Sequence, residues 1–355
     1  MIDKSPFRKE DSKFLAHLRA LSIFIIVFGH VGGFWVFGPP SKFLLVFLSF
    51  FFFISGVVSF VSIERYRLVL KWMLRRFLSL YVPYLLFCLV PLGVYLFFYH
   101  AFPSFSLGAS LDWLIMYPAA SYKLYPLGHL WFLQTLMIIT VFFAPLMFVS
   151  FKKSIIVPWI YFVGVSLLAF FKLVGIITHD FSFCGISIYK PLVYSLFYVL
   201  AWFFVNGKSI LLHVRFVLSM LCVFMFCLLF VLFKNNSPFF EGHVHPPDLY
   251  FVSASILCII FLVRIQKSFN LLFSVPILRA FSKFFFEHTY SIYLLHTFSI
   301  FLVETVFNFL LPNVKNFSYG LIKLSLVLLL TSMFALLFDL VVKRVTRQLL
   351  SFLGV

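Results

Sequence analysis

The first apolar segment of the chain carries two side chains that could move a proton or hold an anion. The segment HLRALSIFIIVFGHVGGFW contains Arg19 and His30, 11 residues apart. On a helix this spacing returns to within about 20° of one direction and rises about 16 Å, so both side chains share a face. Ionisable groups in such a segment are functional candidates, and histidine suits general-base work near neutral pH. The alternatives are a snorkelling anchor for Arg19 and a neutral His30 bonded to a neighbouring helix.

A second apolar segment, YSIYLLHTFSIFLVETVF, contains Tyr293, His296 and Glu304. Tyr293 and His296 are three residues apart and can touch on a helix. Counted from the start of this run, His296 lies about 9 Å deep and Glu304 about 21 Å deep. The alternative for Glu304 is an interfacial residue at a ragged helix end.

Counted in the same way, Arg19 lies about 8 Å and His30 about 24 Å into the first segment. The two segments therefore offer polar groups at two matching depths. If the two segments are neighbours, which the sequence does not determine, an inner layer would hold Arg19 with His296, and an outer layer would hold His30 with Glu304. In the outer layer the Glu304 carboxylate would orient or polarise His30 for work as a general base.

Two further patterns hold candidate site residues. GHLWFL places His129 and Trp131 at the start of another apolar run, where Trp is also common as an interfacial residue. ERYRLVLKWMLRR ends in Arg75 and Arg76. Arginine binds phosphate through two parallel hydrogen bonds, so this basic stretch could cradle a phosphate-rich ligand. The alternative is simple membrane topology with lipid headgroup contact.

The elements that position these residues must be membrane helices. Hydrophobic residues make up 63% of the 355 residues, charged residues only 11%, and the mean hydropathy is +1.09. This composition excludes disorder, collagen and a soluble enzyme, and the long apolar runs lack the alternation of barrel strands. We predict an all-α polytopic bundle of about ten spans, at about 14–37, 43–63, 77–98, 127–149, 155–171, 188–205, 216–233, 249–264, 289–311 and 320–342.

Basic residues set the expected orientation. About three times as many Lys and Arg lie on the side that holds both termini, which predicts that both termini are cytoplasmic. Topology also accounts for the net charge of +17, so no nucleic-acid partner is expected. The outward loop 99–126 and the inward stretch 265–288 are expected along the membrane interface. No connection is long enough for a soluble domain, which leaves one membrane-embedded domain over 1–355. The five cysteines show no metal or disulfide spacing.

Four patterns in sequence order carry a resemblance: Arg19 with His30, FFFISG, GHLWFL and YSIYLLH. On a chain with this many spans they resemble the acyltransferase family 3 group of membrane proteins. The family's arginine and histidine of the first span fall on Arg19 and His30. Its basic motif after the second span places two Arg three residues apart, followed by Pro. Here Ser79 stands three residues after Arg76, with Pro83 downstream.

The resemblance implies transfer of an acyl group, often acetyl from acetyl-CoA, to a hydroxyl of a surface or secreted molecule. We expect an O-acyltransferase of the bacterial inner membrane that acetylates a cell-surface polysaccharide such as O-antigen. Acetyl-CoA is then a substrate, and neither a tightly bound cofactor nor a metal is expected. The other expected partners are membrane lipids and a lipid-linked or surface glycan. Donor phosphates are assigned to Arg19, Arg75 and Arg76, and a direct ternary transfer is favoured over a covalent intermediate.

Two other classes also place ionisable residues in many apolar spans. A transporter or flippase of lipid-linked glycans would be expected to have spans interrupted by Gly or Pro near the midplane, and these are few here. A glycan polymerase would be expected to have a large outward loop carrying Arg, whereas the outward basic residues are all Lys.

Overall fold

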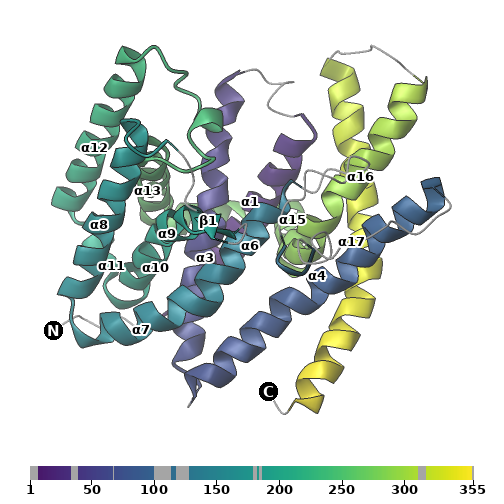
Figure 1. Ribbon diagram of the computed structural model, residues 1–355, viewed down its shortest axis with the longest axis horizontal. Helices are drawn as coiled ribbons and strands as arrows, with labels where there is room; N and C mark the ends of the chain where they lie inside the picture. Colours follow the sequence, from purple (N-terminus) through teal and green to yellow (C-terminus); the bar gives the residue numbers. More distant parts are fainter. Residues whose placement is uncertain are drawn as a thin grey trace. The chain divides into compact units, whose positions relative to one another are not determined.

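The computed structural model is almost entirely helical, as the sequence predicted. It describes residues 7–32, 39–66, 68–99, 113–116, 128–178, 182–183, 186–310 and 317–353. The chain divides into two compact units, each assembled from segments far apart in the sequence (Figure 1). The first unit comprises Met1–Ile26, Phe37–Val69 and Ile138–Glu287, and the second comprises Val27–Val36, Leu70–Met137 and His288–Val355.

Most elements belong to the first unit. In chain order they are most of α1 (Lys9–His30), η1 (Pro39–Val46), α3 (Phe47–Ile63), η2 (Ile139–Phe143), α7 (Ala144–Lys153), α8 (Ile156–Leu173), β1 (Ser182–Phe183), β2 (Ile186–Ser187), α9 (Tyr189–Tyr194), α10 (Leu196–Asn206), α11 (Lys208–Leu212), α12 (Val214–Phe233), η3 (Phe240–Gly242), α13 (Leu249–Arg264), α14 (Gln266–Leu272) and α15 (Pro276–Glu287). The second unit holds the end of α1 and nearly all of α4 (Val69–Tyr99), α6 (Leu130–Ile138), α16 (Thr289–Leu310) and α17 (Phe317–Phe352).

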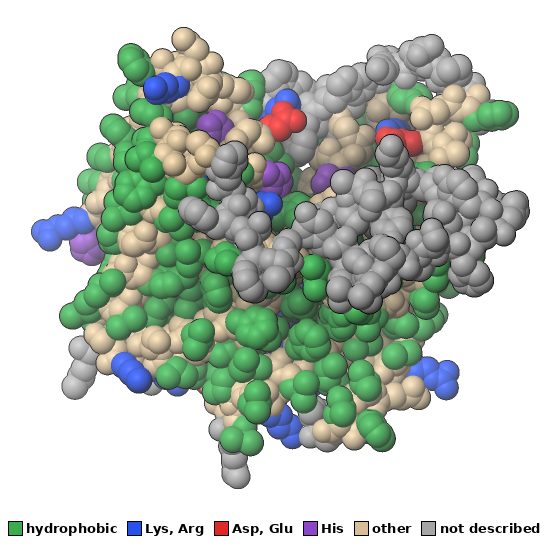
Figure 2. All heavy atoms as spheres, in the orientation of Figure 1, with side chains coloured by type: hydrophobic (Ala, Val, Ile, Leu, Met, Phe, Trp, Pro, Cys, Tyr) green, Lys and Arg blue, Asp and Glu red, His purple; other side chains and the backbone are tan. Residues whose placement is uncertain are grey.

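In the part of the chain that the structure describes, fewer helices can cross a membrane than the ten predicted. Among the described residues, eight are long and apolar enough, or nine if α13 and α14, which are bent by 73°, form one span. The chain is therefore a polytopic membrane protein. Hydrophobic side chains cover most of the described surface on the face shown in Figure 2, and charged side chains are sparse there. The cytoplasmic placement of both termini stays a prediction.

The predicted span 188–205 is the clearest departure. It forms two short helices, α9 and α10, which are separated at Ser195. The Ser195 hydroxyl donates to the carbonyl oxygen of Leu192 at 2.5 Å, a local bond that competes with helical pairing. All residues of 196–204 are buried, so α10 is a core helix of the first unit and not a helix that faces lipid.

Gly56 lets α10 pack closely against α3. A Cβ atom built on Gly56 would lie 2.8 Å from the Cβ of Ala201 and 3.1 Å from the Cα of Tyr198. Only a residue without a side chain fits a helix crossing this tight. The FFFISG pattern thus has a packing reason, because it supplies the glycine at the contact between α3 and α10.

Three hydroxyl groups form a closed triangle beside this contact. Tyr198 Oη lies 2.6 Å from Thr140 Oγ1 and donates to Ser55 Oγ at 2.8 Å, and Ser55 Oγ lies 3.2 Å from Thr140 Oγ1. Thr140 is carried by η2, a single turn of π-helix between α6 and α7. Each hydroxyl both donates and accepts, so the triangle satisfies polar groups that would otherwise be costly to bury.

In the second unit, α16 and α17 lie side by side (Figure 1). The Asp339 carboxylate of α17 accepts hydrogen bonds from the Ser291 hydroxyl and from Nδ1 of His288 at 2.5 Å. It also pairs at 3.1 Å with Lys343, which lies four residues further along the same helix. Asp339 therefore ties the start of α16 to α17.

The two predicted interfacial segments have different outcomes. The stretch 265–288 forms α14 and the amphipathic α15, whose Phe281 and Phe285 pack on Phe24 of α1 while Ile277 stays 80% exposed. The loop 99–126 lies outside the described residues except for 113–116. The carbonyl of Trp113 in that short piece accepts a hydrogen bond from the Tyr84 hydroxyl of α4 at 2.5 Å.

Candidate active site

His30 lies in the last turn of α1. The helix begins at Lys9 and ends at His30. Both ends lie earlier in the chain than those of the predicted span 14–37. The helix ends at His30 because Gly32 adopts φ +90°, a left-handed conformation that favours glycine and is typical of helix C-termini. The amide of Gly32 donates to the carbonyl oxygen of Gly29 at 3.1 Å. The sequence HVGG thus places an exposed histidine residue at the end of a helix.

His296, in contrast, is fully buried within α16, with 0% of its surface exposed. Its Nδ1 lies 2.7 Å from the carbonyl oxygen of Tyr293 and 3.2 Å from that of Ile292. A carbonyl oxygen can only accept a hydrogen bond, so Nδ1 of His296 carries the proton. In the neutral ring Nε2 then carries the lone pair.

The two histidines form a direct hydrogen bond. Nδ1 of His30 lies 2.7 Å from Nε2 of His296. The ring planes differ by 8° and the ring centroids are 4.9 Å apart. The 4.9 Å between the ring centroids is close to the 2.7 Å between the bonded nitrogens plus the radii of the two rings. The two rings therefore meet edge to edge. Because Nε2 of His296 accepts, Nδ1 of His30 donates, and Nε2 of His30 is left with a lone pair.

Two more predicted residues join this pair. The ring of His129, which immediately precedes α6, lies 5.3 Å from the ring of His296 at 72° and 5.3 Å from the ring of Tyr293. The Tyr293 hydroxyl donates to the carbonyl oxygen of His129. His30, His129, Tyr293 and His296 therefore form one cluster, all within the second unit. Trp131 lies on α6, where its ring contacts Phe132 at 6.0 Å.

The predicted pairing of His30 with Glu304 is wrong. Glu304 accepts a hydrogen bond from Lys323 of α17 at 2.6 Å, and its side chain is 47% exposed. His296, which was predicted for the inner layer, bonds to His30, the residue predicted for the outer layer. The depth calculation assumed that both helices start at one membrane surface. The first residues of α16 are buried, Thr289 at 3% and Ser291 at 2% exposure, so this helix starts inside the protein.

The three arginines assigned to the donor lie on α1 and near the start of α4. Arg19 belongs to the first unit, where its guanidinium lies 5.6 Å from the centroid of the Phe286 ring of α15. Arg75 is exposed and Arg76 is half-buried near the start of α4. Ser79, which replaces the second arginine of the family's motif, donates its hydroxyl to the carbonyl oxygen of Arg76 at 2.8 Å.

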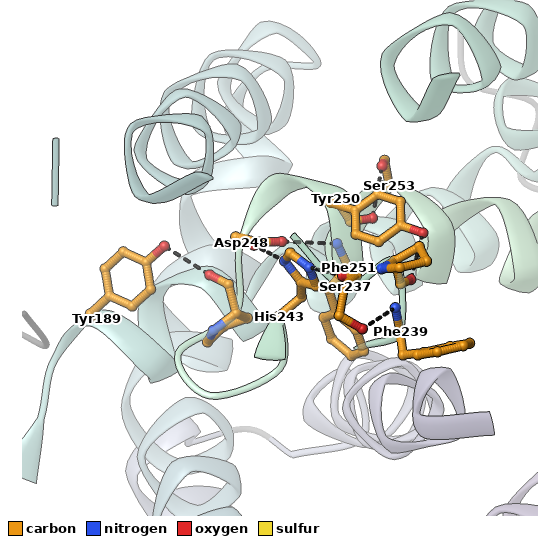
Figure 3. A network of polar contacts seen from close by, with 10 residues as sticks. Tyr189, Ser237, Phe239, His243, Asp248, Tyr250, Phe251 and Ser253 are labelled. Carbon is orange, nitrogen blue, oxygen red and sulfur yellow. Dashed lines mark hydrogen bonds and ion pairs between the residues drawn. The ribbon is translucent and has the colours of Figure 1, made fainter. Parts of the chain in front are cut away.

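Sequence reasoning missed a buried ion pair in the segment between α12 and α13 (Figure 3). Nδ1 of His243 lies 2.5 Å from the Asp248 carboxylate, and its Nε2 lies 3.0 Å from the carbonyl oxygen of Ser237. Both partners accept, so both ring nitrogens donate and the ring is an imidazolium. Burial lowers the pKa of His243, but the hydrogen bond and charge of Asp248 outweigh it and raise that pKa above its usual value. The spacing HVHPPD was the available sequence signal.

Tyrosine hydroxyls hold the same segment in place. Tyr189 donates to the carbonyl oxygen of Pro247 at 2.8 Å, and Tyr250 donates to that of Pro238 at 2.9 Å. Figure 3 shows both tyrosines beside the ion pair. This network is a structural anchor of the first unit.

No group of three His, Cys, Asp or Glu side chains in the described part of the chain could hold a metal ion. The histidine cluster instead arranges its nitrogens as a directed chain of hydrogen bonds. The fold and this cluster define a polytopic membrane protein with an exposed histidine residue whose Nε2 carries a lone pair.

Comparison with protein families then identifies the chain. The model of the family described as "Acyltransferase domain" matches residues 12–338. The chain belongs to acyltransferase family 3, and it is a membrane-bound transferase that takes an acyl donor and an acceptor. Membership sets aside the transporter and polymerase alternatives. No curated protein and no solved structure matches the chain.

Proposed function

We propose that this acyltransferase moves an acetyl group from cytoplasmic acetyl-CoA to a hydroxyl of a cell-surface polysaccharide such as O-antigen. It would do so in the bacterial inner membrane, with both termini in the cytoplasm. The observation that carries the proposal is the directed pair of histidines. It leaves Nε2 of His30 unprotonated on a residue that is exposed, and a lone pair on this nitrogen is what a general base for an alcohol requires.

The reaction proceeds by direct transfer. The acceptor hydroxyl oxygen attacks the thioester carbonyl carbon while Nε2 of His30 takes the hydroxyl proton. The C–S bond then breaks, the CoA sulfur receives the proton back from His30, and the acetyl ester and CoA leave. Because His30 sits in the last turn of α1, the negative end of the helix dipole stabilises the imidazolium formed midway.

The donor is proposed to bind through its phosphates. Arg75 and Arg76 are consecutive residues near the start of α4, and Arg19 lies on α1, the helix that carries His30. Arginine forks match phosphate geometry, so these side chains suit the diphosphate and the 3′-phosphate of CoA. The proposal needs no resident cofactor, because acetyl-CoA is consumed as a substrate. The acceptor would be a lipid-linked or surface glycan.

The test is acetyl transfer by the purified protein in detergent, followed as release of the free CoA thiol in the presence of glycan acceptor. We expect His30→Ala to lower kcat at least 100-fold, within the range attributed to a general base. His213→Ala, a change at an exposed histidine, should keep full activity. Activity of His30→Ala equal to that of the control would refute the assignment of the base.

A second experiment tests the acceptor. Deletion of the gene should remove acetyl esters from the surface polysaccharide, seen by NMR of the isolated glycan, without changing its chain length. Restoring the wild-type gene should restore the esters. Unchanged acetylation in the deletion strain would refute the polysaccharide as acceptor, and shortened chains would indicate a role in polymerisation.

A further inference from the structure

We infer that His296 is the positioning residue of the site, because it holds His30 in the tautomer whose Nε2 can accept the acceptor's proton. The inference rests on the proposed function, in which His30 is the base. His296 itself is fully buried and has no exposed atom with which to touch a substrate. Its role must therefore pass through His30.

The direction of the hydrogen bonds comes from the backbone of α16. The carbonyl oxygens of Tyr293 and Ile292 accept from Nδ1 of His296. This fixes the lone pair of His296 on Nε2, 2.7 Å from Nδ1 of His30. His30 must then carry its proton on Nδ1. Two backbone carbonyls of α16, which cannot titrate, thus determine which nitrogen of the His30 ring is basic.

A neutral imidazole has two tautomers, and which one is present depends on the bond made by the other nitrogen. In the alternative tautomer of His30, a proton on Nε2 would face the acceptor hydroxyl, and no lone pair would be available there. The bond to His296 disfavours that state, because it would leave a buried acceptor unpaired. When His30 takes a proton, the same bond becomes charge-assisted and stronger.

The ring of His296 is held in place on several sides. Its Nδ1 is bonded to the backbone, the His129 ring packs edge-on at 5.3 Å, and the Tyr293 ring lies 6.0 Å away. The 8° angle between the two bonded rings keeps the bond close to the ring planes, the direction of the nitrogen lone pairs. The cluster thus restrains the motion that would break the bond.

The first test compares His296→Leu and His296→Gln with the control His213→Gln. Leucine fills space but can neither donate nor accept. Glutamine carries both an amide donor and an amide acceptor. We expect His296→Leu to lower kcat about 10–100-fold, the size of effect seen for residues that orient a functional histidine, with the KM for acetyl-CoA nearly unchanged. His296→Gln should recover part of kcat, and His213→Gln should match wild type.

The second test reads the tautomer without any activity. In protein labelled with 15N-histidine, the His30 signals, assigned by their loss in His30→Gln, should show a protonated Nδ1 and an unprotonated Nε2. In His296→Leu the two nitrogens should share the proton. If the His30 signals are the same in His296→Leu as in wild type, or if kcat of that variant equals the control, the inference is overturned.

These outcomes separate the inference from the proposed function. Loss of activity in His30→Ala together with full activity in His296→Leu would refute the positioning role and leave the base in place. Full activity in His30→Ala would refute the base, while the 15N signals of His30 would still report whether His296 sets its tautomer.

Discussion

The close contact at Gly56 makes a quantitative prediction about stability. A methyl group at this position would lie 2.8 Å from the Cβ of Ala201, 3.0 Å from Cγ of Tyr198 and 3.1 Å from its Cα. Two of these atoms belong to or branch directly from the α10 backbone, so they cannot rotate away. α3 and α10 must move apart by several tenths of an ångström. Overpacking of this kind costs about 1–3 kcal/mol.

The matched control is Gly164→Ala. Gly164 is an exposed residue inside α8, and a Cβ there would meet no atom within 4 Å. Both changes remove the same helix-weakening effect of glycine, which is worth about 1 kcal/mol. Gly164→Ala should therefore be neutral or stabilising, and the difference between the variants isolates the clash. Gly56→Val should be worse than Gly56→Ala.

The assay is thermal unfolding in detergent, followed by intrinsic tryptophan fluorescence. We expect Gly56→Ala to melt several degrees below Gly164→Ala, since each kcal/mol shifts the midpoint by about 2–4 °C in a unit of this size. Gly56→Ala should also disturb the adjacent Ser55 hydroxyl and its bonds to Thr140 and Tyr198. A melting temperature of Gly56→Ala at or above that of Gly164→Ala would refute the tight crossing.

Two further predictions concern charged groups. The pKa of His243 is raised in the folded protein. Its bond to Asp248 therefore contributes its full stability at pH values below the ordinary histidine pKa of about 6.5. This contribution is lost as the pH rises through the raised pKa. The melting temperature should fall over that pH window in wild type and fall less in Asp248→Asn, and equal slopes would contradict the imidazolium. Glu304, whose side chain is 47% exposed, pairs with Lys323, and surface pairs are worth about 0–1 kcal/mol, so Glu304→Gln should keep kcat within about twofold of wild type. A loss as large as that expected for His296→Leu would show that the carboxylate acts in catalysis after all.

The sequence identified the participants in the histidine cluster but not their partners. His30, His129, Tyr293 and His296 stood out because each is a polar residue in or beside an apolar run, and periodicity placed Tyr293 beside His296. The error was in the depth at which α16 starts. The length of an apolar run indicates how long a helix is. The depth at which the helix starts depends instead on what covers its first turn. For α16 this is Asp339 of α17, which bonds to His288 and Ser291.

The departures in the first unit have the same origin. The run 188–205 is as apolar as a lipid-facing span, and its composition could not show that α10 is surrounded by protein. The ion pair of His243 and Asp248 lies in a connecting segment, where no periodicity draws attention to single residues.

The sequence by itself determined that this chain is a helical membrane protein, which residues could do proton chemistry, and which family they resemble. These properties are local, because a helix fixes the rise and rotation between its own residues. Only the tertiary structure decided that His296 and not Glu304 faces His30, which nitrogen holds the proton, and why Gly56 must be small. Those properties depend on how helices far apart in the sequence pack together, which the spacing within any one helix does not contain.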